Sequence, residues 1–435
     1  MRIAIIGSGI SGMGAALALS HAGHEIALYE KDLRPGGHAA TVDIQHTGAK
    51  ITVDTGFIVY NTLNYPNFTP MLEWLGVATQ ASEMSFSVSA DQGRLEWAGR
   101  DNGAVLRSLF AQRSNLFSPG FLHMLMEVGR FQTQARSDLQ RGTIGERSLG
   151  DYLNRHRFSA RLRDDYLVPM GAAIWSTSPA RMLEFPATSF ISFFDNHCLL
   201  QWKRPQWRTV TGGSRSYVMA VMRRLGDSLR LGACVTAVHR DESGVEVLDG
   251  DGRSERFDHV IIAAHAPDAL AMLADADANE MDVLGACGYS ANDVILHADP
   301  RLMPRRKDAW AAWNFLREGT DATRKVAVTY WMNALQGIDP ARPVFITLNP
   351  PFEPDPALVF GRYSYDHPQF DLAALEARDR LGTIQGRRRT WFCGAWTRHG
   401  FHEDGLVSGL SVAAALGASA PWAAVADDAL RTAAE

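Results

Sequence analysis

Residues 2–30 read RIAIIGSGISGMGAALALSHAGHEIALYE, which predicts a strand, a glycine turn, a helix and a second strand that ends in an acid. Gly7, Gly9 and Gly12 form the pattern G-x-G-x-x-G. The first glycine permits a tight turn, the second lets a pyrophosphate approach the backbone, and the third lets the helix pack against the strand. Glu30 lies 30 − 9 = 21 positions after Gly9, near the ~20 expected of a carboxylate that binds ribose hydroxyls. The stretch therefore predicts a dinucleotide site, although NAD and FAD share the pattern.

Composition narrows the class of protein. The chain has 435 residues, beyond the ~250–300 at which a single core stops growing, so we expect two domains. The net charge of −5 argues against a nucleic-acid partner. The four cysteines show no C-x-x-C pattern and the fourteen histidines show no ligand spacing, so we expect neither disulfides nor a metal site. Because a strand pattern begins at residue 2, we expect no signal peptide and a cytoplasmic location.

The rest of the chain alternates between two kinds of pattern. Gly36-Gly37 forms a second glycine turn, which suits a phosphate or the ribityl part of a flavin but also suits a hairpin. From Leu116 to about Thr188 the pattern is helical and rich in Met, Phe and Trp. Val260–Ala264 is fully apolar, as in a buried parallel sheet, so the dinucleotide domain resumes there after an insertion. Residues 281–384 look like strands of a second sheet.

The last segment, CGAWTRHGFHEDGLVSGL (393–410), predicts a strand that ends at Gly394, a turn, and a helix that opens with Glu403-Asp404-Gly405-Leu406. It resembles the C-terminal flavin box of the superfamily of flavin amine oxidases, phytoene desaturases and protoporphyrinogen oxidases. The resemblance implies FAD as the cofactor and a helix N-terminus that points at the flavin ring. It also implies an amine-oxidase-like α/β fold, with a Rossmann-type FAD-binding domain and an α+β substrate domain of mixed sheet and helices. Many members have Gly-Asp where this chain has Gly394-Ala395, so an acidic contact to the cofactor must come from Glu403 or Asp404, or is absent.

A narrower resemblance extends over most of the chain. DTGFIVYN (54–61), PQWRTVTGGSRSYV (205–218), YWMNALQ (330–336) and ITLNP (346–350) resemble a bacterial family of predicted NAD/FAD-binding proteins. Its members are often encoded beside cyclopropane-fatty-acid-synthase-like methyltransferases, and they include the flavin desaturases of the furan fatty acid route. The resemblance implies a methyl-branched fatty acyl chain of a phospholipid as substrate, a functional link to a lipid methyltransferase, and peripheral contact with the inner face of the membrane. Three basic clusters suit anionic headgroups, although such clusters are more often solvated faces: Arg204–Arg208, Arg301–Lys307 and Arg387–Arg389. The oligomeric state stays open.

These patterns and resemblances give the following assignment. We expect the FAD-binding domain to comprise residues 1–75, 205–280 and 385–425, and the substrate domain to comprise 76–204 and 281–384. Cofactor contacts are expected at the two glycine turns, the acidic strand end, the DTGF segment, one strand beside the adenine, and the C-terminal box. These residues are Gly7, Gly9, Ser11, Gly12, Glu30, Lys31, Gly37, His38, Thr55, Gly56, Phe57, Val235, Gly394, Glu403, Asp404 and Leu406.

Dehydrogenation by a flavin also needs an acceptor for one proton. The candidate catalytic residues are His402 and Glu403 first, then His399 and Tyr365, with His367 in reserve. An alternative of equal weight is that neither residue is catalytic. In that case Glu403 only caps a helix, and His402 only forms a hydrogen bond with the backbone.

Two alternatives stay open. A flavin amine oxidase would need an aromatic cage, for which Trp396 is a candidate, and in many members a lysine. The late lysines Lys307 and Lys325 lie in polar, loop-like sequence. The other alternative is a flavin-bound accessory or non-redox protein that works with a lipid methyltransferase.

Overall fold

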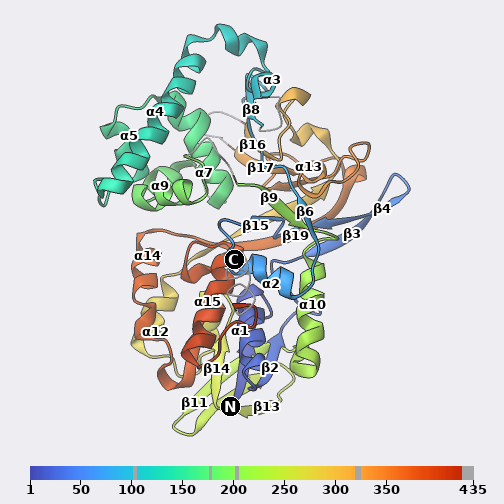
Figure 1. Ribbon diagram of the computed structural model, residues 1–435, viewed down its shortest axis with the longest axis vertical. Helices are drawn as coiled ribbons and strands as arrows, with labels where there is room; N and C mark the ends of the chain where they lie inside the picture. Colours follow the sequence, from blue (N-terminus) through green and yellow to red (C-terminus); the bar gives the residue numbers. More distant parts are fainter. Residues whose placement is uncertain (101–104, 176–178, 201–204, 319–324, 424–435) are drawn as a thin grey trace, which may run out of the picture.

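The computed structural model describes residues 1–100, 105–175, 179–200, 205–318 and 325–423. Two lobes are stacked along the long axis of the molecule (Figure 1). Between them lie the strands β15 (Tyr289–His297), β19 (Val359–Pro368) and β9 (Trp207–Val210). The lower lobe contains the N-terminus and a parallel sheet. The upper lobe contains a larger mixed sheet and a group of helices (Figure 1).

The lower lobe is built on a five-stranded parallel sheet. Its central strands are buried on both faces, as expected for a parallel sheet, whereas the edge strand that contains Leu231 is partly exposed. In spatial order they are β10 (Leu229–Leu231), β2 (Glu25–Glu30), β1 (Arg2–Ile6), β14 (His259–Ile262) and β20 (Thr390–Phe392). Because all five strands run the same way, their carboxyl ends meet at one edge, where ligands of such sheets bind.

Helices and a second small sheet cover the parallel sheet. They are α1 (Ile10–His21), α10 (Arg215–Leu225), α11 (Ala266–Met272), α12 (Ala278–Gly285), α14 (Leu372–Asp379) and α15 (His402–Ala415), with the antiparallel strands β11 (Val235–Asp241), β12 (Gly244–Asp249) and β13 (Ser254–Phe257). The Arg240 guanidinium is fully buried against the Glu280 carboxylate and fixes β11 to α12.

Short elements connect the two lobes. They are the hairpin β3 (Thr41–His46) and β4 (Ala49–Asp54), the helix α2 (Phe68–Trp74), and a sheet of β5 (Val59–Asn61), β9 (Trp207–Val210) and β6 (Thr79–Ala81). The buried Asp54 carboxylate accepts hydrogen bonds from the Ser214 backbone N–H (2.8 Å) and from the Gln336 side chain (2.8 Å). It thereby joins the turn before α10 to the upper lobe.

The upper lobe has a seven-stranded sheet packed against helices. Its strand order is β19 (Val359–Pro368), β15 (Tyr289–His297), β18 (Phe345–Leu348), β17 (Lys325–Trp331), β16 (Trp313–Glu318), β7 (Phe86–Ala90) and β8 (Leu95–Gly99). Only β16 and β7 pair in parallel among these neighbours. The helices are α3 (Val105–Leu109), α4 (Pro119–Arg141), α5 (Leu149–Arg155), α6 (Ala160–Leu162), α7 (Val168–Trp175), α8 (Pro179–Glu184), α9 (Ala187–Asn196) and α13 (Met332–Gln336).

The architecture agrees with the predicted α/β fold. The apolar strand predicted near Val260 pairs with β1 in the parallel sheet, although the paired residues Ala4 and Val260 lie 260 − 4 = 256 positions apart in the chain. The helical pattern predicted for 116–188 becomes several short helices after the long α4. The exact residue bounds of the two domains stay a prediction, and parts of them (101–104, 176–178, 201–204, 319–324 and 424–425) lie outside the described residues.

Candidate active site

The first glycine turn has the shape that a pyrophosphate needs. Gly7 has a φ of +104°, and a Cβ on Gly12 would clash with the Gly7 carbonyl oxygen. A Cβ on Gly9 would have no described atom within 4 Å, so the backbone there faces open space. Helix α1 begins after Gly9 without a side-chain cap in the described structure, which leaves its first N–H groups available to an anion.

The acidic end of β2 lies beside this turn. Glu30 is 7% exposed, and its Oε2 accepts hydrogen bonds from the Ser8 backbone N–H (3.0 Å) and the Ser8 hydroxyl (2.6 Å). The Ala233 N–H donates to the Glu30 carbonyl oxygen (2.9 Å), which brings the start of β11 at Val235 to the same place. Lys31, in contrast, is exposed. Glu30 and the Val235 strand are therefore placed to hold the adenosine end of a dinucleotide.

The second glycine turn lies directly on the first. A Cβ on Gly37 would come 3.2 Å from Gly9 Cα, and the Gly36 N–H donates to the Ser8 hydroxyl (3.1 Å). The Arg34 guanidinium donates to the carbonyl oxygen of Gly37 (2.8 Å), which fixes the loop. The two turns therefore form one backbone-lined surface.

The C-terminal helix reaches the same edge of the sheet. A Cβ on Gly405 would lie 2.8 Å from Ile10 Cγ2, and a Cβ on Gly409 would clash with the Ser11 carbonyl oxygen. The Gly394 N–H donates to the Ser408 hydroxyl (2.9 Å), so the turn after β20 is tied to this helix. The glycines let α15 pack close to α1 and bring both helix N-termini, with Leu406, to one site.

The DTGF segment continues this surface. The Phe57 N–H donates to the His38 carbonyl oxygen (2.8 Å), and a Cβ on Gly56 would clash with the same oxygen. The Thr55 hydroxyl lies 2.7 Å from the Tyr365 hydroxyl of β19. The structure therefore brings residues 38 and 55–57 together with a strand of the upper lobe.

His402 begins α15 and stacks on Phe57, with ring centroids 3.7 Å apart and an interplanar angle of 9°. Its Nε2 lies 2.8 Å from the Tyr217 hydroxyl. Its Nδ1 has no hydrogen-bond partner among the described residues. Burial lowers the pKa of His402 to about 3, so the imidazole is neutral at physiological pH.

Glu403 points away from His402, toward α2. Its carboxylate accepts hydrogen bonds from the Asn67 backbone N–H (2.9 Å), the Asn67 amide group (2.7 Å) and the Phe68 backbone N–H (3.0 Å). Burial nevertheless raises the pKa of Glu403. These are the contacts of a helix cap, so the geometry favours the capping interpretation of Glu403 over that of a base.

The remaining residues of the C-terminal box have separate positions. The Asp404 carboxylate accepts a hydrogen bond from the Phe401 N–H (3.0 Å) at the start of α15, and burial raises its pKa. His399 lies on an exposed turn. Trp396 is buried, and its indole N–H donates to the Ala264 carbonyl oxygen (3.2 Å), so it packs in the core of the lower lobe.

A half-buried cluster of polar rings lies between the second glycine turn and β19. The His38 ring is 5.3 Å from the Tyr365 ring and 5.9 Å from the His367 ring, measured between centroids. The Asn292 amide lies 3.0 Å from His367 Nδ1. Burial, helped by the charge of His367, lowers the pKa of His38 to about 3. Sequence reasoning missed Asn292, because only the pairing of β15 with β19 sets it opposite Tyr365.

An aromatic wall leads from the start of α15 into the helices of the upper lobe. Phe401 stacks on Phe193 of α9 at 4.8 Å, and Phe193 lies 4.8 Å from Trp175 of α7. Trp175 in turn lies 4.9 Å from Phe185. These side chains belong to the main apolar cluster of the upper lobe. The aromatic contacts that begin beside His402 therefore continue into the apolar interior of the upper lobe.

Metal sites and membrane-crossing helices are both absent from the described residues. No group of three or more His, Cys, Asp or Glu side chains is arranged there to hold a metal ion. None of the described helices combines the length and the hydropathy that a membrane crossing requires.

Comparison with known proteins identifies the family. The model of the family "Flavin containing amine oxidoreductase" matches residues 10–341. The chain belongs to this family. It is therefore a member of a family of FAD-dependent oxidoreductases, and FAD is the cofactor of this family.

Several known proteins are similar to this chain over most of its length. A putative flavin-containing monoamine oxidase, AofH, of Mycobacterium tuberculosis is 23% identical over 403 residues, which are 87% of this chain and 77% of the relative. A redesigned variant of putrescine oxidase has the same fold, with a TM-score of 0.68 and 16% identity over 96% of this chain and 99% of that one. A CLA-producing fatty acid isomerase from P. acnes also has this fold, with a TM-score of 0.63 and 14% identity over 94% and 96%. The predicted two-domain amine-oxidase-like fold is thereby confirmed.

Proposed function

We propose that the protein is an FAD-dependent dehydrogenase that removes two hydrogens from a hydrophobic substrate, a methyl-branched fatty acyl chain of a phospholipid. The observation that carries this proposal is the aromatic wall from Phe401 through Phe193 to Trp175. Each CH₂ group of an acyl chain that is buried against these rings would contribute about 0.8 kcal/mol of favourable binding free energy. The sequence resemblance to the methyltransferase-associated bacterial family supports an acyl substrate and a functional link to a lipid methyltransferase.

The chain's own residues divide the binding of FAD among them. The turn Gly7–Gly12 and the start of α1 would hold the pyrophosphate, and Glu30 with the Val235 strand would hold the adenosine end. The start of α15 and Thr55–Phe57 would hold the ring end. When bound, FAD supplies the acceptor for the hydride that leaves the substrate.

We assign the proton of the second broken C–H bond to His402. Its imidazole is neutral, its ring is held by Phe57 and by the Tyr217 hydroxyl, and its Nδ1 is free among the described residues. A carbon chain that has lost a hydride is electron-poor, so even a weak base takes the neighbouring proton. Glu403 acts in this proposal as a positioning residue, because its carboxylate holds the start of α2.

Oxidation of a small amine is the second candidate. The family description and the AofH relative favour it. Two observations count against it. Trp396, the candidate cage residue, packs in the core of the lower lobe, and Lys307 lies in the pocket at the far end of the upper lobe. The side chain of the other late lysine, Lys325, lies outside the described residues.

Anaerobic mixing of the flavin-loaded protein with each substrate class separates the candidates. We expect a methyl-branched phospholipid to bleach the flavin absorbance and a panel of primary amines, including putrescine, to leave it unchanged. The reverse result would establish amine oxidation and reject the lipid substrate. If neither class bleaches the flavin, the accessory or non-redox role replaces both.

A further inference from the structure

The far end of the upper lobe carries a cluster of exposed apolar side chains. Six of the fourteen large apolar side chains that are exposed in the described part of the chain fall within residues 105–126. We call them the apolar tip: Val105, Leu106, Leu116, Phe117, Leu122 and Met126. Phe117 is 86% exposed and Leu106 is 73% exposed. Such a concentration on one surface marks an interaction site.

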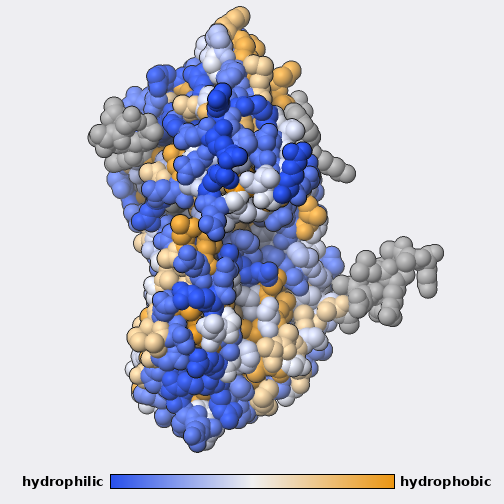
Figure 2. Space-filling model, turned by 90° about the vertical axis from the view of Figure 1, so that its left-hand side faces the viewer, coloured by the Kyte–Doolittle hydropathy of each residue, from blue (hydrophilic) through white to orange (hydrophobic). Residues whose placement is uncertain are grey.

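The apolar tip projects from one end of the molecule. It spans α3, the short helix η1 (Arg113–Phe117) and the first turns of α4, and Figure 2 shows hydrophobic residues gathered at this end. Leu122 and Met126 are four positions apart and share a face of α4. Beneath them Phe121 is fully buried, with its ring 6.1 Å from that of Phe110. The exposed side chains therefore stand on a packed base.

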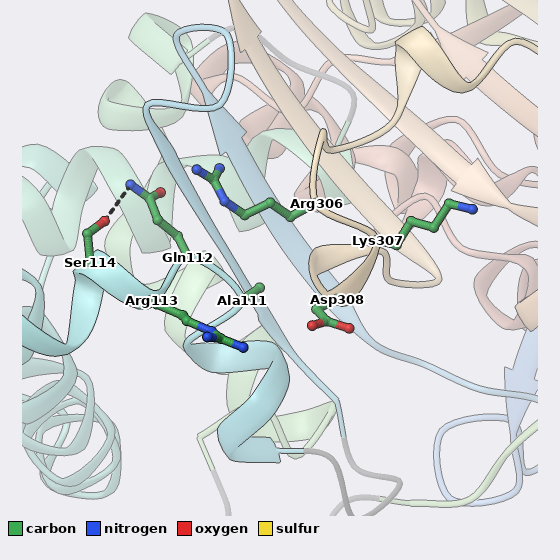
Figure 3. A pocket seen from close by; sticks show the side chains of 7 residues that line it. All are labelled: Ala111, Gln112, Arg113, Ser114, Arg306, Lys307 and Asp308. Carbon is green, nitrogen blue, oxygen red and sulfur yellow. Dashed lines mark hydrogen bonds between the residues drawn. The ribbon is translucent and has the colours of Figure 1, made fainter.

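A basic pocket of about 550 Å³ adjoins the apolar tip. Figure 3 shows Gln112, Arg113 and Ser114 of η1 and the preceding turn on one wall, and Arg306, Lys307 and Asp308 on the other. The second wall belongs to the loop around the short helix η5 (Lys307–Ala309). Arg306 and Lys307 belong to one of the three basic clusters that the sequence offered for anionic headgroups.

The charges of this end are not balanced. Asp308 is paired with Arg107 (2.8 Å), and Arg306 is paired with the buried Glu96 (2.8 Å). Arg113 and Lys307 have no ion-pair partner among the described residues. Residues 105–126 contain no Asp or Glu at all. Arg113 and Lys307 are therefore two uncompensated cations beside the apolar tip, and their side chains do not point toward each other (Figure 3).

We propose that the apolar tip and the basic pocket dock the protein on a bilayer that contains anionic phospholipid. Apolar side chains with flanking cations suit the boundary between lipid headgroups and acyl chains. There the apolar side chains are buried among the acyl chains and the cations bind the phosphate groups. The charge asymmetry favours this occupant over a second protein surface, which would leave the two cations to be compensated separately. The inference rests on this surface alone and goes beyond the choice of substrate.

Flotation of the flavin-loaded protein with vesicles tests the docking surface. The probes are vesicles of phosphatidylglycerol with phosphatidylethanolamine, and vesicles of phosphatidylcholine alone. We expect flotation with the anionic vesicles, with binding weakened by about 0.5 M salt. The double variant Leu106→Ser/Phe117→Ser should bind at least ~20-fold more weakly, and Arg113→Gln about fivefold more weakly at low salt.

Matched controls lie on the lower lobe. Leu372→Ser removes an apolar side chain that is 65% exposed on α14, and Arg223→Gln removes an exposed cation on α10; both should float as the parent does. Retained flavin absorbance checks that each variant is folded. No flotation of the parent at low salt, or equal flotation of the double variant, would overturn the proposal. The proposal would also be overturned if sedimentation showed that the parent protein is a dimer and the double variant is a monomer. None of these outcomes depends on whether the flavin is bleached by lipid.

Discussion

The hydroxyl of Tyr365 lies 2.7 Å from the hydroxyl of Thr55. The contact joins the edge strand β19 of the upper lobe to the segment that we expect to face the flavin ring. Both residues are partly or fully buried, and burial raises the pKa of Tyr365, so its hydroxyl stays protonated at physiological pH. The position of Thr55 therefore depends on a residue more than 300 positions away in the chain.

The first expected outcome concerns this contact. Tyr365→Phe removes the hydroxyl and should lower the free energy of unfolding by about 1 kcal/mol. It should also weaken FAD binding, because Thr55 loses the partner that fixes it. Tyr363→Phe is the matched control, since Tyr363 lies two positions away on β19. Equal FAD dissociation constants for the two variants would remove the positioning role of Tyr365.

The second concerns the proton acceptor. His402→Gln keeps the size of the side chain but removes the basic nitrogen, and should slow anaerobic flavin reduction about 100-fold. FAD binding should change much less than the rate, because the His402 side chain does not contact the glycine turns that would hold the pyrophosphate. Stopped-flow absorbance measures both quantities. A variant that reduces its flavin at the parent rate would exclude His402 and move the assignment to His38.

The pH dependence of the parent provides an internal check on this assignment. A base must be deprotonated to act, and the pKa of His402 is lowered to about 3. The imidazole therefore stays neutral as the pH falls, and flavin reduction should be constant from about pH 8 to about pH 5. Loss of rate with a midpoint near pH 6.5 would show that an ordinary histidine accepts the proton.

The third prediction distinguishes the two roles considered for Glu403, a helix cap and a catalytic base. In Glu403→Gln the amide group faces donors from Asn67 and Phe68, so at least one of the hydrogen bonds to α2 is lost. The free energy of unfolding should fall by about 1–3 kcal/mol, whereas flavin reduction by the folded, flavin-loaded variant should be unchanged. Asn67→Ala removes the hydrogen bond from the Asn67 amide group to the same carboxylate. It should also lower the free energy of unfolding and leave flavin reduction unchanged. A large loss of rate in Glu403→Gln alone would identify Glu403 as the base.

The fourth concerns the approach of the two helices. Gly409→Ala places a methyl group against the Ser11 carbonyl oxygen, and we expect a loss of about 3 kcal/mol in stability together with loss of bound FAD. Gly129→Ala is the control, because a Cβ there meets no described atom within 4 Å in the middle of α4. It should be neutral or stabilise by up to about 1 kcal/mol. Thermal unfolding and the flavin absorbance of the purified variants measure both effects.

Sequence reasoning succeeded where short-range spacing decides the geometry. Gly7, Gly9 and Gly12 lie within one turn, so their pattern alone predicts the shape that the backbone adopts. The meeting of α15 with α1 was predictable only through the resemblance of the C-terminal box, because it joins the two ends of the chain. The close contact of Gly409 with Ser11 is its physical basis.

The rest depended on contacts that no local pattern encodes. The spacing of His402 and Glu403 could not show that their side chains diverge, the first toward Phe57 and the second toward Asn67. The cluster of His38, Tyr365 and His367 forms because β15 and β19 pair across the sheet. The sequence predicted strands within residues 281–384 but not which of them pair, and the specific substrate stays a proposal for the same reason.

The mass of the product tests the central claim most directly. The flavin-loaded protein is incubated with a methyl-branched phospholipid and an electron acceptor, and the acyl chains are released and weighed by mass spectrometry. We expect an acyl chain that is lighter by two hydrogens, and no such product with His402→Gln over the same time. Acyl chains of unchanged mass, in a sample whose flavin is reduced by an amine that loses two hydrogens, would contradict the account.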